Sequence, residues 1–218
     1  MRSDSGPFGK KINRTFTETA RRAQIVTAAI DTIAELGYGR ASLARIAETA
    51  GTSKSVILYH FSGKDDLIRE LVAALAGRAG EYLRPRVDAQ PTGAGMLRAY
   101  IEANLAFMGE NRALVVAAVE IALNARGADG SPLIDQPGPD TALAELLAHF
   151  QGTGELRAGF DPLAMAMAIR AAIDAAPARL AREPGFDLVH YARELAGIFE
   201  LATSPPGLAP TSCFPAGA

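Results

Sequence analysis

Cysteine and tryptophan are scarce in this sequence of 218 residues. Tryptophan is absent and Cys213 is the only cysteine, so neither a disulfide within the chain nor a cysteine metal cluster can form. The longest apolar stretch, residues 113–123, has 11 residues and contains Glu120, which makes it too short to span a bilayer. The first residues also carry no apolar signal segment. We therefore expect a cytoplasmic protein, with no metal and no cofactor.

Sequence signatures of catalysis are missing as well. There is no glycine-rich phosphate loop, no Rossmann glycine pattern, no nucleophile elbow and no His-Glu metal spacing. The three histidines, His60, His149 and His190, are far apart in the sequence. We expect that the protein is not an enzyme. A helical adaptor that binds only protein is the other alternative to the function developed below.

Charge is distributed unevenly along the chain. Residues 1–64 hold ten Lys and Arg but five Asp and Glu, a net charge of +5, whereas the remainder has a net charge of −7. All four lysines lie in those first 64 positions. A basic segment beside a larger acidic one is typical of a module that binds a polyanion, although short segments also differ in charge by chance.

Apolar spacing and turn residues predict an all-α fold of about nine helices. The abundance of Ala and the short β-branched runs favour helix over sheet. Pro85 is expected to break the chain after the fourth helix, and Pro177 to kink or end the eighth. The expected helices cover about residues 16–36, 42–50, 54–59, 64–84, 96–109, 112–126, 141–151, 162–176 and 187–202.

The most informative pattern lies between Ser42 and Lys64. Ser42 precedes a short helix, Gly51 lies in a tight turn, Ser53 caps a second short helix, and Lys64 opens a long one. This order is typical of a helix-turn-helix, whose second helix enters the DNA major groove with its N-terminal residues at the base edges. Short polar or basic side chains suit that end of the helix. Here they are Thr52, Ser53, Lys54 and Ser55.

The run from Gly51 to Leu67, GTSKSVILYHFSGKDDL, resembles the DNA-binding segment of the tetracycline-repressor (TetR) family. The family pattern is a Gly-Val-Ser-type turn, then Tyr-His-Phe, then a Lys and an acid that open the fourth helix. The resemblance covers about residues 20–75. It implies a bacterial transcriptional repressor that binds a double-stranded DNA operator as a homodimer and is released by a small molecule. A regulator that activates, or that uses no ligand, is the alternative.

The resemblance also implies a domain organisation. Residues 16–63 would form the three-helix DNA-binding domain, residues 64–84 a connecting helix, and residues 85–203 a larger helical domain that binds the effector and dimerises. Residues 1–15 would be a flexible basic arm, which either reaches a minor groove or is an ordinary tail. Residues 204–218 would be a disordered tail.

By position, the resemblance implies which residues contact DNA. Leu58 stands where the family often has a phosphate-binding Tyr, and this departure leaves two alternatives: Leu58 contacts the DNA without that hydroxyl, or it only packs. His60 either contacts the DNA backbone or packs against the fourth helix. The implied phosphate contacts are Ser42, Arg45 and Lys64, the implied backbone contacts are Tyr59 and His60, and Thr52, Ser53, Lys54 and Ser55 would face bases or phosphates.

A pocket in the larger domain would hold a small, largely hydrophobic effector, because its candidate walls are mostly apolar. Met and aromatic residues at helical spacing are equally consistent with plain core. Glu120, the one charge in its stretch, either meets a polar group of the ligand or pairs with an arginine such as Arg170. The candidate pocket residues are Leu75, Tyr100, Asn104, Phe107, Met108, Val116, Glu120, Phe150, Met165 and Ile169.

Stripes of residues on the last two helices predict the dimer interface. Two such helices from each subunit could form a four-helix interface with a short separation of the helix axes. The alternative is that the stripes pack inside one subunit. They are Ala164, Ala168, Ala171 and Ala175 on the first of these helices, and Leu188, Ala192, Leu195, Ala196 and Phe199 on the last.

Overall fold

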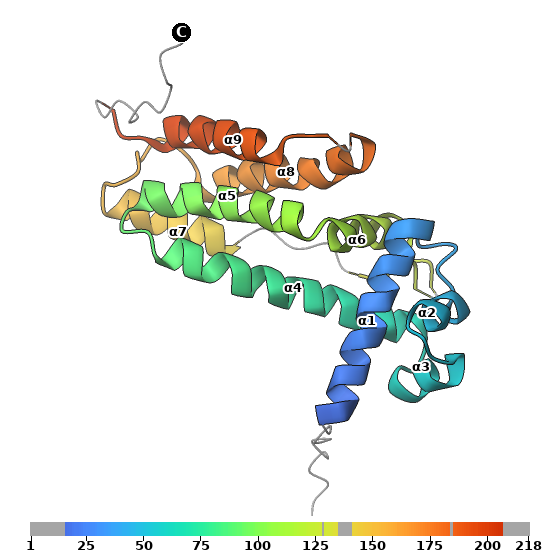
Figure 1. The fold of residues 1–218 in the computed structure, drawn as a ribbon. Coiled ribbons are helices and arrows are strands. Elements are labelled where there is room, and N and C mark those ends of the chain that lie inside the picture. The colour runs from blue at the N-terminus through green and yellow to red at the C-terminus, as the bar shows by residue number, and fades with distance from the viewer. Residues whose placement is uncertain (1–15, 128, 135–140, 184, 207–218) are drawn as a thin grey trace, which may run out of the picture.

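The computed structural model describes residues 16–127, 129–134, 141–183 and 185–206 (Figure 1). Within these ranges the regular structure is helical, apart from one isolated bridge between Arg126 and Pro132, so the all-α prediction is confirmed. None of the described helices combines the length and apolar character that crossing a membrane requires. The helices are α1 (Phe16–Leu36), α2 (Leu43–Thr49), α3 (Lys54–His60), α4 (Lys64–Asp88), α5 (Gly93–Glu110), α6 (Arg112–Asn124), α7 (Thr141–Gly152), α8 (Pro162–Arg182) and α9 (Leu188–Thr203).

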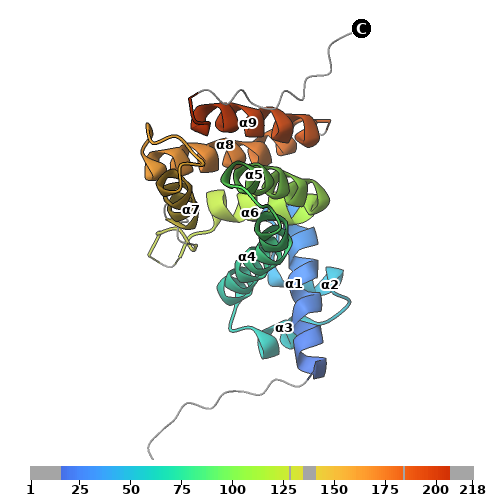
Figure 2. The same cartoon turned by 90° about the vertical axis from the view of Figure 1, so that its left-hand side faces the viewer.

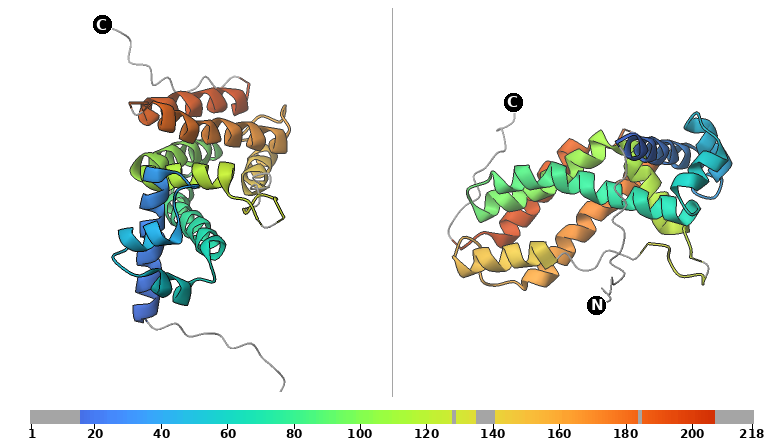
Figure 3. Two further views of the ribbon diagram at one scale, coloured as in Figure 1. Left: turned by 90° about the vertical axis from the view of Figure 1, so that its right-hand side faces the viewer. Right: turned by 90° about the horizontal axis from the view of Figure 1, so that it is seen from below.

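The helices are arranged in two unequal groups. Helices α1 to α3 form a small group at one end of the molecule, and α8 and α9 form the outer layer at the opposite end (Figures 1 and 2). The long helix α4 begins beside α3 and runs along α5, while α1 packs on α6 (Figure 3). This arrangement separates the predicted DNA-binding helices from the predicted dimer helices.

Two buried clusters hold these groups together. The first cluster contains the apolar face of α1, with Ile25, Ile30 and Ile33, and it continues through α4 to Phe107 and to residues of α6. The second cluster lies between α5, α7, α8 and α9. Because the first cluster includes both α1 and α6, the core of the small group is continuous with the rest of the protein.

Caps and glycines set the ends of the first three helices as the sequence indicates. The side chains of Ser42 and Ser53 cap α2 and α3. Gly37 and Gly51, which follow α1 and α2, have φ values of +78° and +60°. Those left-handed conformations cost other residues energy, so glycine allows the chain to turn sharply at both places.

Two predicted helix ends are wrong, both at prolines. Helix α4 continues through Pro85 to Asp88, and α8 continues through Pro177 to Arg182. Proline removes one backbone hydrogen bond, which nearby contacts can offset. In the turn that contains Pro85, the Arg86 guanidinium lies over the ring of Tyr82, 3.5 Å from its centroid, which packs this part of α4 together. In α8 the residues beyond Pro177 are anchored by Leu180, which is buried and whose carbonyl accepts from Arg112 Nη2 at 2.9 Å.

Some sequence predictions fall on parts of the chain outside the described residues. The basic arm at residues 1–15 lies there, as does the predicted tail from residue 207 onward. These two predictions are therefore untested.

Candidate nucleic-acid interface

Short-range hydrogen bonds define the ends of helices α2 and α3. Ser42 Oγ accepts from Arg45 N, and Ser53 Oγ accepts from Val56 N, both at 3.3 Å. Between the two helices, Thr52 N donates to Ala47 O at 2.9 Å. These bonds satisfy backbone groups that a helix end leaves unpaired, and they start both helices at the predicted residues.

Helix α3 has one buried face and one exposed face. Ile57 is fully buried, and Phe61, which follows the helix, is buried beside it in the first cluster. Leu58 is 46% exposed, so it does not simply pack into the core. The exposed residues of the helix and its cap are Ser53, Lys54, Ser55, Leu58 and Tyr59. Three of the four residues predicted to face bases or phosphates are therefore exposed, and the fourth, Thr52, is half-buried.

Arg22 on α1 positions α3, a role that the sequence analysis missed. The guanidinium is buried, lies over the ring of Phe61 at 4.1 Å from its centroid, and pairs with Glu70 on α4 at 2.8 Å. It also donates to the backbone carbonyl of His60 at the end of α3. A cation donating to the last carbonyls of a helix stabilises that end. The signal in the sequence was only an arginine three residues before the buried Ile25.

His60 is half-buried. Its Nδ1 is buried and has no hydrogen-bond partner among the described residues, and the ring meets the edge of Tyr59 at 5.1 Å between centroids. Its predicted contact with the DNA backbone is untested. Tyr59, by contrast, is 79% exposed.

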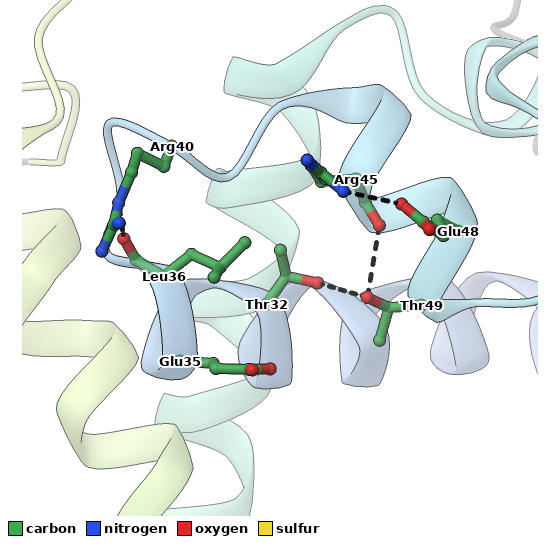
Figure 4. A pocket seen from close by; sticks show the side chains of 7 residues that line it. All are labelled: Thr32, Glu35, Leu36, Arg40, Arg45, Glu48 and Thr49. Atoms are coloured by element: carbon green, nitrogen blue, oxygen red, sulfur yellow. Dashed lines mark hydrogen bonds and ion pairs between the residues drawn. The ribbon is translucent and has the colours of Figure 1, made fainter.

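Arg45 lies at the edge of an open hollow of about 560 Å³ between α2 and the end of α1 (Figure 4). Its Nη1 pairs with Glu48 Oε2 at 3.1 Å, and both side chains are largely exposed. Exposed pairs of this kind contribute little to stability, so Arg45 can exchange Glu48 for a phosphate at small cost. On the other side of the hollow, Arg40 Nε donates to Leu36 O at 2.7 Å.

Lys64 is turned toward the loop after α1. Its Nζ donates to Tyr38 O at 2.7 Å and lies 3.8 Å from the centroid of the Tyr38 ring. Burial lowers the pKa of this ammonium below its ordinary value, and the nearby Asp65 carboxylate acts in the opposite direction. An ammonium has three donors, so the bond to Tyr38 leaves two for the predicted phosphate contact.

Glu120 on α6 contacts the same loop. Its Oε2 accepts from Tyr38 N at 3.1 Å and from Asn124 Nδ2 at 3.3 Å. The predicted pairing with Arg170 is wrong, because α6 packs on α1 and directs this carboxylate to the DNA-binding helices rather than to α8. We call the three residues Lys64, Tyr38 and Glu120 the Tyr38 bridge. It joins the start of α4, the loop between α1 and α2, and α6.

The remaining predicted pocket residues divide between the two clusters. Leu75 and Phe107 belong to the first cluster, whereas Tyr100, Met108, Phe150, Met165 and Ile169 belong to the second. Val116 is half-buried on α6. Their assignment to an effector site is therefore still a prediction.

One polar group lies among the apolar residues of α5 and α8. Arg170 Nη1 donates to Tyr100 Oη and to the buried Asn104 Oδ1, both at 3.3 Å. The same guanidinium makes two bonds to Asp174, of 2.7 and 3.1 Å. Arg170 thus pairs with residues of α5 and with Asp174 of its own helix. The sequence had suggested Glu120 as its partner.

The predicted dimer residues behave differently on the two helices. Ala164, Ala168, Ala171 and Ala175 are exposed on α8. On α9 the prediction is wrong, because Leu188, Ala192, Leu195 and Ala196 are buried and Phe199 packs against the same core, on the side of α9 that faces α5. Away from α5, α9 exposes Ile198 and Leu201, and α8 exposes Leu163 and Met167 beside the alanines.

The profile of a family described as "Bacterial regulatory proteins, tetR family" matches residues 25–71, which run from α1 into α4. The DNA-binding part of this chain therefore matches the TetR family. The matched region contains both helices of the helix-turn-helix and the buried residues that support them. The TetR resemblance stated from residues 51–67 is thereby confirmed.

Similar proteins extend this result. The HTH-type transcriptional regulator BetI 1 of Chromohalobacter salexigens is 33% identical over 85 residues, which are 38% of this chain and 42% of that protein. The match therefore spans less than half the length of this relative. FadR from Bacillus subtilis, solved in complex with stearoyl-CoA, has a TM-score of 0.68 at 21% identity and covers 81% of this chain and 96% of its own.

A TetR-like transcriptional regulator from Rhodococcus sp. RHA1 has a TM-score of 0.64 at 24% identity, over 82% of this chain and 92% of that one. At these identities the solved structures show that the fold is shared. They extend the likeness beyond the DNA-binding helices to the larger helical domain of the TetR fold.

Proposed function

We propose that this protein is a transcriptional repressor that binds a palindromic DNA operator as a homodimer and is released by a small, largely apolar effector. The observation that carries the proposal is the coincidence of the TetR match at residues 25–71 with the exposed face of α3. A major groove admits one helix, and the exposed residues of α3 include a lysine and two polar side chains near its N-terminus.

The proposed DNA contacts are Ser42, Arg45, Thr52, Ser53, Lys54, Ser55, Tyr59, His60 and Lys64. Charge supports these contacts, because Lys54 and Arg45 are exposed and residues 1–64 have a net positive charge. Neutralising phosphates releases counterions, so binding should weaken steeply with salt.

The proposed dimer interface is the exposed side of α8 and α9. Small residues at 164, 168, 171 and 175 would let a partner helix approach closely, and Met167 and Ile198 supply exposed apolar surface beside them. A palindromic operator requires such a two-fold axis, because each half-site is read by one α3.

The effector proposal rests on the apolar interior between α5 and α8. FadR, which shares the fold, was solved with stearoyl-CoA, a ligand with a long apolar chain. An effector can act only through a difference in its affinity for the DNA-bound and DNA-free shapes. Movement of α4 or α6 would reach the DNA-binding helices, since α4 begins at Lys64 and Glu120 on α6 contacts Tyr38.

The test is selection of a binding sequence from random duplex DNA with the full chain, followed by titration at several salt concentrations. A palindromic consensus is expected. Lys54→Ala should flatten the slope of log affinity against log salt by about one unit per subunit. Arg78→Ala, which removes an exposed charge from α4, is the matched control and should leave the slope unchanged. Failure to select any sequence would reject the proposal.

A further inference from the structure

Helix α3 exposes two large apolar side chains side by side. Leu58 is 46% and Tyr59 is 79% exposed, whereas the other large apolar side chains described in α1 to α4 are buried or half-buried. Exposure of adjacent large apolar residues on a helix of seven residues leaves apolar surface in water, which usually marks a contact surface.

Leu58 lies on the same face of α3 as Lys54, one helical turn earlier, and both are exposed. The residue before Leu58, Ile57, is fully buried and anchors α3 to the core. A groove-bound α3 would therefore turn Leu58 toward the DNA together with Lys54. The side chain has no donor and no acceptor, so it cannot read the hydrogen-bonding pattern of the bases.

Among the four bases, thymine alone presents an apolar group, its C5-methyl, in the major groove. We propose that Leu58 determines specificity by contacting the C5-methyl of a thymine, and that each half-site of the operator carries a T·A pair at that position. This inference rests on the proposed operator binding. Tyr at position 58 would add a hydroxyl for a phosphate, whereas Leu gives up that contact and offers only apolar surface.

The experiment removes single methyl groups from the DNA. In the selected operator, each thymine is replaced in turn, in both half-sites, by deoxyuridine, which pairs with adenine but lacks the C5-methyl. We expect one thymine position at which this replacement lowers the affinity of the wild-type protein by about tenfold, the effect of losing two buried methyl contacts.

The protein variant assigns that loss to Leu58. Leu58→Ala should bind the thymine and deoxyuridine operators equally at that position, while circular dichroism shows an unchanged helical fold because the side chain is exposed. The matched control is Leu123→Ala, which truncates another exposed leucine at the end of α6 and should keep the wild-type discrimination.

Two results would overturn the inference while leaving operator binding intact. One is a wild-type protein that binds every deoxyuridine operator as well as the thymine operator. The other is a Leu58→Ala variant that still distinguishes the two bases, which would move the contact to another residue. If no operator can be selected, the proposed function fails first, and this inference fails with it.

Discussion

Removing the Glu120 carboxylate tests whether the Tyr38 bridge stabilises the protein. Glu120 Oε2 accepts from Tyr38 N at 3.1 Å across two packed helical groups, and both residues are half-buried. A hydrogen bond to a charged acceptor contributes about 1.5–3 kcal/mol, and partial exposure favours the lower end of that range. Glu120→Ala should therefore lower the free energy of unfolding by about 1.5 kcal/mol, and Glu120→Gln by less because an amide oxygen can still accept.

Urea unfolding followed by circular dichroism measures this change. Glu145→Ala, at an exposed position of α7, is the control because it makes the same substitution in another helix. Lys64 bonds to the carbonyl of Tyr38, so Glu120→Ala and Lys64→Ala should not be additive, with a coupling of at least 0.5 kcal/mol in a double-mutant cycle. Equal stabilities of Glu120→Ala and Glu145→Ala would refute the reasoning.

Three other substitutions test the remaining assignments. Ala168→Arg should place a charge among the exposed alanines of α8 and give monomers in sedimentation. Ala148→Arg, at an exposed position of α7, should leave the dimer intact. Dimers of both variants would place the interface elsewhere. Leu195→Ala should instead cost about 2–4 kcal/mol of stability by leaving a cavity under α9, measured by urea unfolding, and an unchanged midpoint would contradict its burial. Arg22→Met should cost about 2–3 kcal/mol and lower operator affinity, because Glu70 loses its partner and α3 loses its anchor; unaltered DNA binding would show that α3 is positioned without it.

Local signals made the DNA-binding helices predictable. Ser42 and Ser53 cap with their own side chains, and Gly37 and Gly51 take conformations that glycine favours, so each boundary is set by residues within a few positions. The helix ends predicted at Pro85 and Pro177 were wrong because contacts elsewhere in the fold decide whether a helix continues through a proline. Pro177 lies inside α8, where Arg112 on α6 binds the carbonyl of Leu180 in the following turn, and no pattern near Pro177 reveals that partner.

Periodicity also could not decide which neighbour a helix face meets. The spacing of Leu188, Ala192 and Leu195 correctly indicates one apolar face on α9, but a face that packs on α5 and a face that packs on a second subunit have the same spacing. The deciding fact is the second, exposed apolar side of α9 at Ile198 and Leu201. The fold assigns the first of these sides to the subunit core and leaves the second for the proposed dimer interface.

For the charged residues of the candidate site, too, the sequence did not reveal which neighbour each side chain contacts. Lys64 and Glu120 are 56 positions apart and were assigned to two different ligands, a phosphate and an effector, yet both bind the backbone of Tyr38. Close-packed interiors transmit displacement rather than absorb it, and here the first cluster runs without interruption from α6 to α1. A change in the position of α6 must therefore either move the loop that precedes α2 or break the bond from Tyr38 to Glu120. While that bond holds, the DNA-binding helices follow α6, which is the coupling that the proposed effector response requires.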